Sequence, residues 1–495
     1  MKLSVLLSAL EDYRVQIGER ESSETPEVEV SGLCADSRLY KKGELFICLT
    51  GGKVDSHKFA TEALEKGAAA VLTEREIECN GVQIIVRDTR EAMSLLSAAF
   101  YGNPSKKMQI VGVTGTNGKT TTSYMLAEIF KRAGKKTGVI GTLGIYYDKK
   151  EIAPELTTPD PIFLQKILAD MAAKGIEYVV MEVSAHALYY KKVEGIRFAT
   201  CIFSNLTQDH LDFFPSMQEY KKAKLDLFSP ERCPLAIVNA DDETSVEILS
   251  LREKSDKSGM TKTRLYGLET LTDAFAVVTD ESVKGIRFLL NINDKLARVN
   301  LRLTGVHNVY NSLSAAVCAL ELGLTTEDVA RGLNGLKGVK GRLEWIANYN
   351  GADIFVDFAH TPDGLEKSLK ALKLHCKGRL ICLFGCGGNR DKSKRPLMGE
   401  RAAKLSDFSY LTSDNPRFED PSDIIKDIEK GYRRFSTAYV AVPDRERAIV
   451  QAIEELDEGD ILLVAGKGAE DYQEKMGIKY VYNDENLILK TIKKD

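Results

Sequence analysis

The last third of the chain alternates strand and helix patterns without a break, and this alternation constrains the fold more than any other feature of the sequence. Successive segments after residue 342 switch between the two patterns, from "ADIFVDF" to "DILLVAG". Helices between buried strands return the chain to the same edge of a sheet, so the strands run parallel. Residues 339–495 are therefore predicted to form a doubly wound, Rossmann-like α/β domain.

A glycine-rich loop follows the buried strand pattern "MQIVGV" (108–113) and precedes the helix pattern "TTTSYMLAEIFKRAG". The loop is one residue shorter than the familiar nucleotide loop, because Val113 stands where that loop has its first glycine. Unpaired N–H groups at the start of a helix favour an anion. We predict that this loop holds ATP, with Lys119 on the outer phosphates and Thr120 on Mg²⁺. A simple strand-to-helix turn is the alternative, which the Lys-Thr pair disfavours.

The rest of the chain divides into two further α/β domains. Strand patterns at 44–50 and 82–88 accompany helix patterns at 57–70 and 89–100, and the cluster "YGNPS" predicts a linker. We expect a first domain at 1–106 and a central ATP-binding domain at 107–338. Alternating apolar and polar residues between 273 and 304 predict hairpins that cover one edge of the central sheet.

Composition excludes several classes of protein. A formal net charge of −4 gives no general attraction to nucleic acid or anionic membranes. The N-terminal "MKLSVLLSAL" is followed at once by Glu11 and Asp12, which favours an amphipathic first helix over a signal peptide. The nine cysteines and six histidines lack zinc spacing, so reduced and mostly buried thiols are expected. We expect a cytoplasmic protein with no membrane insertion.

Acidic and basic residues follow two of the buried strand patterns. Glu182 ends "YVVME", where a carboxylate needs a partner, and Mg²⁺ beside a phosphate loop is a natural one. Asp209 and His210 follow "ATCIFSNL". A salt bridge for Glu182 and a capping role for His210 are the alternatives from these residues alone.

In these motifs the chain resembles the Mur ligases. The motifs include "VTGTNGKTTT", "MEVSAHAL", "SNLTQDHLDFF", "EYKKAKLDLF", "DFAHTPDGLE", "SDNPRFEDP" and "GKGAEDYQ", in the family's order, with "DSRLYKKGELFICLTG" at the N-terminus. The central loop alone does not separate this family from folylpolyglutamate synthetases, but the N-terminal and Asp-Asn-Pro-Arg motifs do. The resemblance implies three α/β domains: a UDP-binding N-terminal domain, a P-loop ATPase domain and a Rossmann-like C-terminal domain.

The resemblance also implies a reaction. Mur ligases use ATP to phosphorylate a carboxylate, and an amine then attacks the acyl phosphate. The motifs are most similar to those of members that extend UDP-N-acetylmuramoyl-L-alanyl-D-glutamate (UDP-MurNAc-L-Ala-D-Glu) by its third peptide residue in peptidoglycan synthesis. The expected partners are these small molecules, ATP and an acceptor amino acid, and the expected state is a monomer.

Site residues are carried over from the matching motifs. The nucleotide is expected at Gly115, Thr116, Asn117, Gly118, Lys119, Thr120, Thr121, Asn308, Asn311, Arg342 and Asp357. Mg²⁺ is expected at Thr120, Glu182 and His210, and at Lys224 as a carbamate formed with CO₂. The catalytic set is Lys119, Lys224, Glu182 and His210. The UDP-sugar dipeptide is expected at Ser37, Gly52, Lys53, Val54, Thr157, Thr158, Ser184 and Lys192.

The acceptor is the last inference from the resemblance. "DNPR" (414–417) is typical of members that use meso-diaminopimelate, whereas users of L-lysine usually lack the arginine. A guanidinium binds the extra carboxylate through two hydrogen bonds, and a site built for it rejects lysine by roughly 10⁴-fold. The acceptor is expected at Arg390, Asp414, Asn415, Pro416, Arg417, Gly466 and Glu470, with L-lysine as the alternative.

Two residues depart from the family pattern. Lys192 stands where an arginine is expected, and Ala469 replaces a histidine. His360 and Asp363 are expected on the hinge side of the third domain.

Two other classes of protein compete with a ligase. A phosphate-loop switch needs no acceptor site, and a UDP-sugar-binding module needs no Lys119, Glu182 or His210. ATP consumption that depends on both UDP-MurNAc-dipeptide and an amino acid separates the three.

Overall fold

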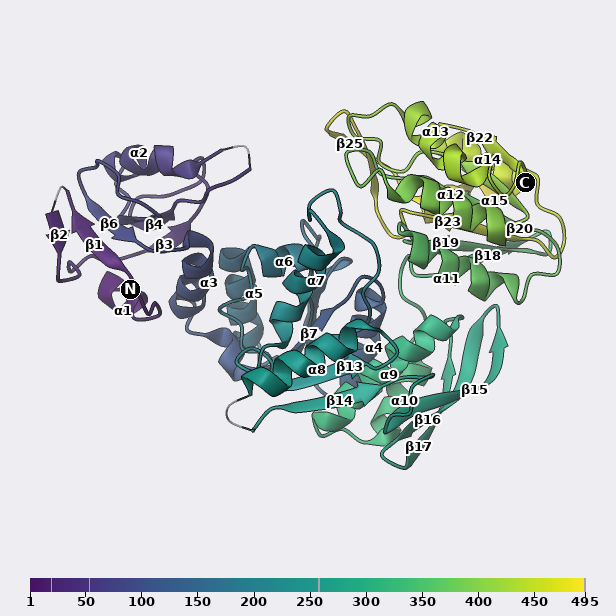
Figure 1. Cartoon of the computed structure of the whole chain (residues 1–495), viewed down its shortest axis with the longest axis horizontal. Helices are drawn as coiled ribbons and strands as arrows, with labels where there is room; N and C mark the ends of the chain where they lie inside the picture. Colours follow the sequence, from purple (N-terminus) through teal and green to yellow (C-terminus); the bar gives the residue numbers. More distant parts are fainter. Residues whose placement is uncertain (19, 53, 257–258, 494–495) are drawn as a thin grey trace. The chain divides into compact units, whose positions relative to one another are not determined.

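The structure, a computed structural model, describes residues 1–495 except 19, 53, 257–258 and 494–495, and the chain forms two compact units (Figure 1). The first unit comprises Met1–Gly112, Lys136–Ala199 and Glu231–Cys233, and the second comprises Val113–Lys135, Thr200–Pro230 and Pro234–Asp495. The division falls within strand β7 (Gln109–Thr114), which begins in one unit and ends in the other. The domain limits at 106/107 and 338/339 stay predictions.

The first unit opens with a six-stranded sheet in the order β2-β1-β6-β5-β4-β3. Strands β3 to β6 run parallel, while β1 and β2 are antiparallel. Apolar residues of α1 and α3 cover one face, and alanines of α2 cover the other. The bounds are α1 Leu3–Leu7, β1 Arg14–Ile17, β2 Arg20–Ser22, β3 Gly32–Cys34, β4 Glu44–Ile47, η1 Ser56–Phe59, α2 Ala60–Glu65, β5 Ala70–Thr73, β6 Val82–Ile85, α3 Thr89–Phe100 and η2 Pro104–Lys107.

Predictions for this region are confirmed in part. The first helix, the strands at 44–50 and 82–88 and the helix at 89–100 are present. The helix pattern over 57–70 is wrong at its end, because α2 stops at Glu65 and residues from Ala70 form β5. Gly67 has a left-handed φ of +94°, which ends a helix and redirects the chain into the buried strand.

The same unit carries the strand order β10-β9-β8-β11-β7. β8 and β11 are parallel, and β9 and β10 add an antiparallel edge. Helix α5 lies beside α3 (Figure 1). The bounds are β8 Thr137–Gly141, β9 Gly144–Tyr147, β10 Lys150–Ile152, α5 Pro161–Ala173, β11 Tyr178–Glu182 and α6 Ala185–Tyr189.

The second unit begins with the predicted loop and helix. Met125, Leu126, Ile129 and Phe130 form the buried stripe of α4, which ends just before Gly134 with its left-handed φ of +77°. Strands β12, β13 and β14 run parallel. The bounds are α4 Lys119–Arg132, β12 Thr200–Phe203, α7 Met217–Leu225, η3 Asp226–Phe228, β13 Leu235–Asn239, α8 Thr244–Ser255, β14 Lys262–Tyr266, α9 Val306–Glu321 and α10 Thr326–Gly335.

The hairpins predicted between 273 and 304 are present as β15 (Ala274–Ser282), β16 (Gly285–Ile292) and β17 (Lys295–Leu301). They form a three-stranded antiparallel sheet of their own. β15 touches the edge strand β14, but the sheet packs mainly on α9 and α10. The expected cover of a sheet edge is therefore only part of its role.

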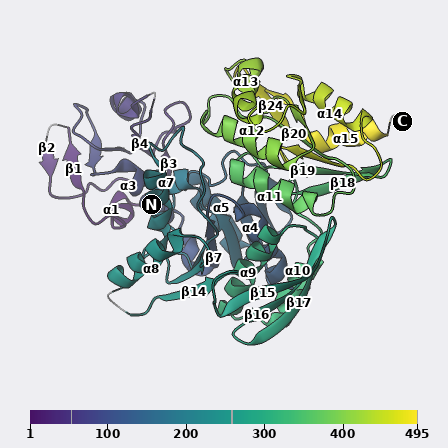
Figure 2. The same cartoon turned by 45° about the vertical axis from the view of Figure 1, so that its right-hand side comes forward.

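The alternating segments after residue 342 form the predicted doubly wound sheet, in the order β18-β19-β23-β20-β21-β22. All neighbouring pairs are parallel except β18 with β19. Residues of β23 alternate between two cores: Ile461, Leu463 and Ala465 face α11, α12 and α13, while Leu462 and Val464 face α14 and α15. Helices α12 and α13 lie side by side (Figure 2).

This region also contains a short C-terminal hairpin, β24 with β25. The bounds are β18 Glu344–Tyr349, β19 Ala352–Asp357, α11 Pro362–Lys373, β20 Leu380–Phe384, α12 Lys394–Leu405, β21 Phe408–Leu411, α13 Pro421–Tyr432, β22 Tyr439–Ala441, α14 Arg445–Glu454, β23 Ile461–Ala465, β24 Tyr472–Lys475, β25 Ile478–Val481 and α15 Asp484–Ile492.

Two general features bear on the sequence-based expectations. Each of the nine cysteines is a thiol and not half of a disulfide, and six of them are buried, as predicted. Across the described ranges, no helix is long and apolar enough to cross a membrane.

Candidate functional site

The phosphate loop (residues 115–119) joins β7 to α4 and depends on two glycines. Gly115 has a φ of +148° and Gly118 a φ of +88°, values that favour glycine. A Cβ built on Gly115 would lie 1.9 Å from Ser204 Oγ, and one on Gly118 would lie 2.5 Å from Asn311 Oδ1. Without side chains at these positions the backbone can approach a ligand closely, as an anion cradle requires.

Lys119, the first residue of α4, folds back onto the phosphate loop. Its Nζ donates to the carbonyl oxygens of Gly115 at 2.8 Å and Thr116 at 2.9 Å. Thr120 is buried, and its Oγ1 accepts a hydrogen bond of 2.9 Å from Nη2 of Arg342. The predicted phosphate lysine and metal hydroxyl are therefore both held at the loop.

Lys224 of α7 is buried beside the same loop. Its Nζ donates to the Gly115 carbonyl at 2.8 Å, the oxygen that Lys119 also contacts, and lies 4.7 Å from the centroid of the Tyr220 ring. Burial lowers the pKa of Lys224 well below its ordinary 10.5, and the charge of Lys119 lowers it further against the attraction of Asp209. Its amine therefore loses a proton more easily than that of an exposed lysine.

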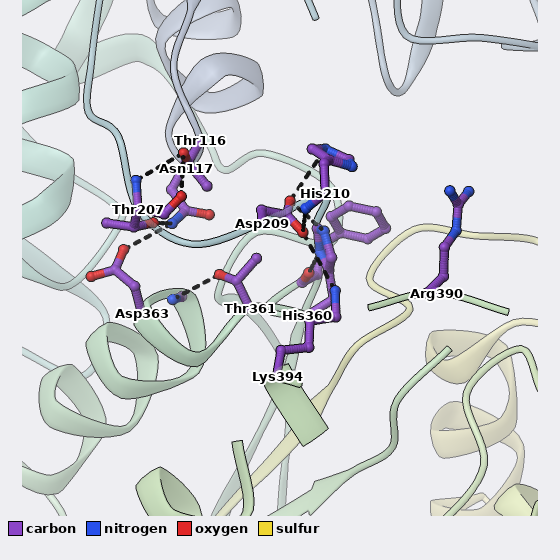
Figure 3. Close-up of polar contacts among 12 residues, drawn as sticks. Thr116, Asn117, Thr207, Asp209, His210, His360, Thr361, Asp363, Arg390 and Lys394 are labelled. Carbon is purple, nitrogen blue, oxygen red and sulfur yellow. Dashed lines mark hydrogen bonds and ion pairs between the residues drawn. The ribbon is translucent and has the colours of Figure 1, made fainter. Parts of the chain in front are cut away.

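Asp209 gathers three basic side chains in the loop after β12 (Figure 3). Its Oδ2 lies 3.2 Å from His210 Nε2 and 3.7 Å from His360 Nε2, and its Oδ1 lies 3.5 Å from Lys394 Nζ. Burial alone would raise the pKa of Asp209, but the hydrogen bond with His360 and the charge of Lys394 hold it well below its usual value. Asp209 is thus an ionised carboxylate that orients His210.

The phosphate loop is also bonded to the third predicted domain. Asn117 Nδ2 donates to Asp363 Oδ2 at the start of α11, at 2.8 Å (Figure 3). In the loop after β12, Gln208 Nε2 donates to Ser393 Oγ at 3.0 Å. Residues of 107–338 and 339–495 therefore meet through polar side chains at this site.

The two asparagines expected at the nucleotide lie buried on α9. Asn311 Nδ2 donates to Asn308 Oδ1 at 3.1 Å, and Asn311 Oδ1 accepts from Thr122 Oγ1 at 3.3 Å. Asn308 Nδ2 donates to the Thr304 carbonyl at 2.7 Å. These bonds fix Asn311 against Gly118, and a direct contact with nucleotide stays a prediction.

His307, beside Asn308, gives the protein an expected pH dependence. Burial lowers the pKa of His307 to about 4, with a further contribution from Lys367. The unfolded chain has a histidine pKa near 6.5, so it binds more protons between about pH 6.5 and 4, and folding stability falls as the pH falls through this window. From pH 7 to pH 5 this residue is expected to cost about 2 kcal/mol.

Thermal melts of wild type and His307→Gln at the two pH values measure this contribution. The melting temperature of the variant is expected to fall less between pH 7 and pH 5 than that of wild type. Equal falls would contradict the assignment, and the His375→Gln variant, at a half-buried histidine, is the control for losing a histidine.

Arg342 and Asp357 lie where the third predicted domain begins. The Arg342 guanidinium lies 4.5 Å from the centroid of the Phe358 ring. Both oxygens of Asp357 accept hydrogen bonds from the backbone, Oδ2 from Leu343 and Oδ1 from Ala359 at 2.7 Å. Burial raises the pKa of Asp357. Asp357 thus holds the backbone at Leu343 and Ala359 in place, and its contact with nucleotide stays a prediction.

In the first unit, Glu182 ends β11 and is completely buried. Thr142 donates to it twice, from N to Oε1 at 3.0 Å and from Oγ1 to Oε2 at 2.9 Å. Thr142 Oγ1 also lies 3.2 Å from Thr157 Oγ1. A Cβ on Gly141 would lie 2.2 Å from Glu182 Oε1, so glycine is needed for this carboxylate to occupy its position.

Three of the residues expected at the sugar dipeptide, Thr157, Thr158 and Ser184, lie near Glu182. Thr158 Oγ1 donates to the Glu182 carbonyl at 2.9 Å and accepts from Ser184 N at 3.0 Å. Lys192 Nζ forms an ion pair of 2.6 Å with Asp160 Oδ1, and its side chain is largely buried. The structure therefore brings Thr157, Thr158 and Ser184 together, while Lys192 has an acidic partner.

The expected UDP contacts in the first domain are more exposed. Ser37 is half-buried, Gly52 and Val54 are exposed, and Lys53 lies outside the described residues. A pocket of about 520 Å³ adjoins this turn. Its lining residues are Val54, Asp55, His57, Lys58, Arg75, Glu76 and Ile77.

Two loops of the third predicted domain, here called the acceptor loops (414–417 and 466–470), lie together after β21 and β23. A Cβ on Gly466 would lie 2.6 Å from Asp414 Oδ2, and Asn415 Nδ2 donates to Glu470 Oε2 at 2.9 Å. Arg417 adopts a left-handed φ of +51°. The expected acceptor residues of these two loops are therefore neighbours.

Arg390 and Arg417 approach one another across Gly387. A Cβ on Gly387 would lie 3.0 Å from Arg417 Nη1 and 3.5 Å from Arg390 Cγ. The Arg390 guanidinium is half exposed and pairs with Asp212 at 3.2 Å. On Gly388, a Cβ would lie 1.9 Å from the Pro416 carbonyl oxygen, so the backbone of this loop touches the acceptor loops.

Sequence reasoning missed several groups at these sites. No role was assigned from the sequence to Thr142, Lys394 or Lys467, although Lys467 lies in "GKGAEDYQ". Only the folded chain shows their contacts with Glu182, Asp209 and Glu470. No group of three or more His, Cys, Asp or Glu side chains that could hold a metal ion occurs in the part of the chain that the structure describes.

Three protein families match consecutive parts of the chain. The Mur ligase family, catalytic domain, matches residues 29–101, the Mur ligase middle domain matches 113–319, and the Mur ligase, glutamate ligase domain, matches 341–468.

Similar proteins cover nearly the whole chain. The UDP-N-acetylmuramoyl-L-alanyl-D-glutamate--2,6-diaminopimelate ligase of Caldanaerobacter subterraneus subsp. tengcongensis is 41% identical and covers 94% of this chain and 95% of its own length. The protein of the same name from Syntrophomonas wolfei subsp. wolfei is 43% identical over 90% and 91%. A solved structure with that name is 31% identical, has a TM-score of 0.71, and covers 100% of this chain and 99% of its own.

Proposed function

Because the chain belongs to the Mur ligase family, we propose that it is an ATP-dependent ligase that joins meso-diaminopimelate to the D-glutamate carboxylate of UDP-MurNAc-L-Ala-D-Glu. The similar 2,6-diaminopimelate ligases align with at least 90% of the chain, so the sequence similarity extends over all three domains. The reaction belongs to the synthesis of peptidoglycan precursors.

The observation that carries the acceptor assignment is the meeting of the acceptor loops. Arg417 supplies a guanidinium for a carboxylate, and Glu470 supplies a carboxylate for an ammonium group. An amino acid with both groups at its distal end matches this pair, whereas lysine offers the ammonium group alone. Asp414, Gly466 and Arg390 complete the proposed acceptor site.

The chemistry needs a leaving group on the carboxylate. Transfer of the γ-phosphoryl group of ATP to the D-glutamate carboxylate gives an acyl phosphate and ADP. The amine of the acceptor then attacks the acyl carbon, and phosphate leaves as the amide forms. The task of the protein in these steps is positioning and charge stabilisation.

The phosphate loop fits the triphosphate that this reaction needs. Gly115 and Gly118 leave the backbone open to a ligand, and Lys119 stands at the helix N-terminus. Lys119 then neutralises the outer phosphates, while Asn311 keeps its place against Gly118. Arg342, which stacks on Phe358 and donates to Thr120, is a further proposed contact for the nucleotide.

Mg²⁺ is proposed at oxygen donors and one histidine. Thr120 and His210 are proposed ligands in the second unit, and Glu182 is proposed as a third on the grounds of its motif. When bound, the ion withdraws charge from the phosphates and from the attacked carboxylate. Few protein ligands suffice, because Mg²⁺ keeps several waters and binds substrate phosphates.

Lys224 is proposed to supply the remaining ligand after reaction with CO₂. Its neutral Nζ forms a bond to the carbon of CO₂, one C–O π-bond becomes a lone pair on oxygen, and a proton leaves the nitrogen. The buried cation becomes an anionic carbamate next to Lys119, whose charge then attracts it. The lowered pKa of Lys224 supports this step because only the unprotonated amine reacts.

The sugar dipeptide is proposed to bind the first unit at Ser37, the 52–54 turn, Thr157, Thr158, Ser184 and Lys192. Lys192 provides charge but lacks the planar fork of an arginine. The proposed setting is the cytoplasm and the proposed state a monomer, which light scattering of the purified protein would test.

Phosphate release in the presence of ATP tests the whole proposal. Release is expected only when UDP-MurNAc-L-Ala-D-Glu and meso-diaminopimelate are both present, with the tripeptide product confirmed by mass. Hydrolysis without either substrate would indicate a phosphate-loop switch, and no release under any condition would indicate a binding module.

Ala469, in the acceptor loops, allows a test of the missing histidine. Ala469→His is expected to change kcat less than about tenfold, or about 1.4 kcal/mol, since Lys119 and the proposed metal already perform the charge stabilisation. Steady-state rates of wild type, Ala469→His and the size control Ala469→Gln measure this. A gain of several hundredfold in the histidine variant alone would contradict a supporting role.

A further inference from the structure

Lys467 is a fully buried lysine within the second of the acceptor loops, one residue after Gly466. Its Nζ donates to Glu470 Oε2 at 2.8 Å and to Asn415 Oδ1 at 3.1 Å. Tyr472 lies on another side of the ammonium group, with its ring centroid 5.5 Å away. A charged group this deep needs such partners, because burial without them costs several kcal/mol.

The three polar side chains form a closed triangle. Asn415 Nδ2 donates to the same Glu470 Oε2 that Lys467 contacts, at 2.9 Å. Asn415 Oδ1 also accepts from the backbone N of Glu474 at 2.9 Å, which fixes the orientation of the amide. One oxygen of Glu470 is therefore held by two donors, and Lys467 is the only charged one of the two.

The other oxygen of Glu470 is left for a ligand. Among the residues that the structure describes, none donates a hydrogen bond to Glu470 Oε1, and the side chain is 25% exposed. A carboxylate fixed through one oxygen presents the second in a defined direction. An ammonium group is the donor that such an oxygen would bind most strongly.

We propose that Lys467 is a positioning residue of the acceptor site: it fixes Glu470 Oε2 and Asn415 so that Glu470 Oε1 meets the distal ammonium group of the diamino acid. This rests on the proposed function and deepens it. Lys467 does not touch the acceptor, and its effect passes through Glu470. Without Lys467, Glu470 can turn toward solvent. Binding of the acceptor must then also order the Glu470 side chain, which weakens the affinity for the acceptor.

Steady-state kinetics of Lys467→Met and Lys467→Gln test this role. Both substitutions remove the charge, and glutamine retains an N–H donor if methionine harms folding. The KM for meso-diaminopimelate is expected to rise about 10- to 100-fold, as for loss of a hydrogen bond to a charged group. The KM values for ATP and UDP-MurNAc-dipeptide are expected to change less than about twofold. Lys479→Met is the matched control. Exposed Lys479 lies over the same Tyr472 ring at 4.2 Å, but within the described part of the chain it forms no hydrogen bond or ion pair with Glu470.

A double-mutant cycle with Glu470→Gln separates positioning from general stabilisation. If Lys467 acts through Glu470, Lys467→Gln should raise the KM for meso-diaminopimelate less than about threefold in the Glu470→Gln background. Equal effects in both backgrounds, an unchanged KM, or a similar rise for all three substrates would overturn the proposal. A wild-type protein that does not use meso-diaminopimelate would instead overturn the proposed function.

Discussion

L-Lysine is expected to be used at least about 10³-fold less efficiently than meso-diaminopimelate by the unmodified protein. The two amino acids differ by one distal carboxylate, and Arg417 is the group that would bind it. Within the described residues, Arg417 Nε pairs with Glu474 at 3.2 Å and Nη1 donates to the Gly388 carbonyl at 2.9 Å. These bonds orient the guanidinium, and they also lessen the penalty of leaving it without a substrate carboxylate. The expected discrimination is therefore below the 10⁴-fold that the motif suggested.

Arg417→Ala is expected to remove most of this preference, by lowering kcat/KM for meso-diaminopimelate far more than for L-lysine. Arg417→Lys should recover part of it, because an ammonium group keeps the charge without the fork. The exposed Arg434→Ala is the control. Comparable kcat/KM values for the two amino acids with wild type would sink the assignment and leave lysine addition as the function.

Lys224→Ala is expected to reduce ligation by about 10³-fold or more, with much of the activity returning in acetate or bicarbonate buffer. A small carboxylate can occupy the space left by the side chain and replace the carbamate as an oxygen ligand. Loss of an interaction that stabilises a developing charge commonly costs this much. The measurement is the rate of tripeptide formation with increasing acetate.

The matched control is Lys222→Ala, an exposed lysine of the same helix, whose rate should stay near wild type with no response to acetate. Near wild-type rates for Lys224→Ala without additive would show that the carbamate idea is wrong.

The lowered pKa of Lys224 also predicts how folding stability depends on pH. Protonating the buried amine costs more in the folded chain than in the unfolded chain, so stability rises with pH below 10.5. Lys224→Met should relieve this cost at neutral pH and raise the melting temperature in CO₂-free buffer.

The parts of the fold that local pattern specifies could be predicted from sequence. The alternation after residue 342 and the stripe of α4 follow directly from strand and helix periodicity. β5 was missed because Ala68, Ala69 and Ala70, the last of which begins the strand, favour a helix, and its burial between β4 and β6 is decided by tertiary packing.

The residues of the candidate site likewise fall into those that a local motif reveals and those that only the folded chain reveals. Glycines 115 and 118 are required by backbone geometry, which a short motif reveals. Lys467 and Lys394 look like surface lysines in the sequence, and nothing local shows that one is enclosed by Glu470 and Asn415 and the other faces Asp209. The contacts of Lys467 with Asn415 and of Lys394 with Asp209 join residues 52 and 185 positions apart, which no periodicity reports.

The bond between Asn117 and Asp363 has a consequence for timing. It links the loop of residues 115–119 to the first turn of α11, and Gln208 with Ser393 adds a second polar contact nearby. Such hydrogen bonds contribute only about 1 kcal/mol each, because water can replace either partner. Thermal motion can therefore break and re-form these two hydrogen bonds. Substrates can enter and products can leave while the hydrophobic cores on either side stay packed.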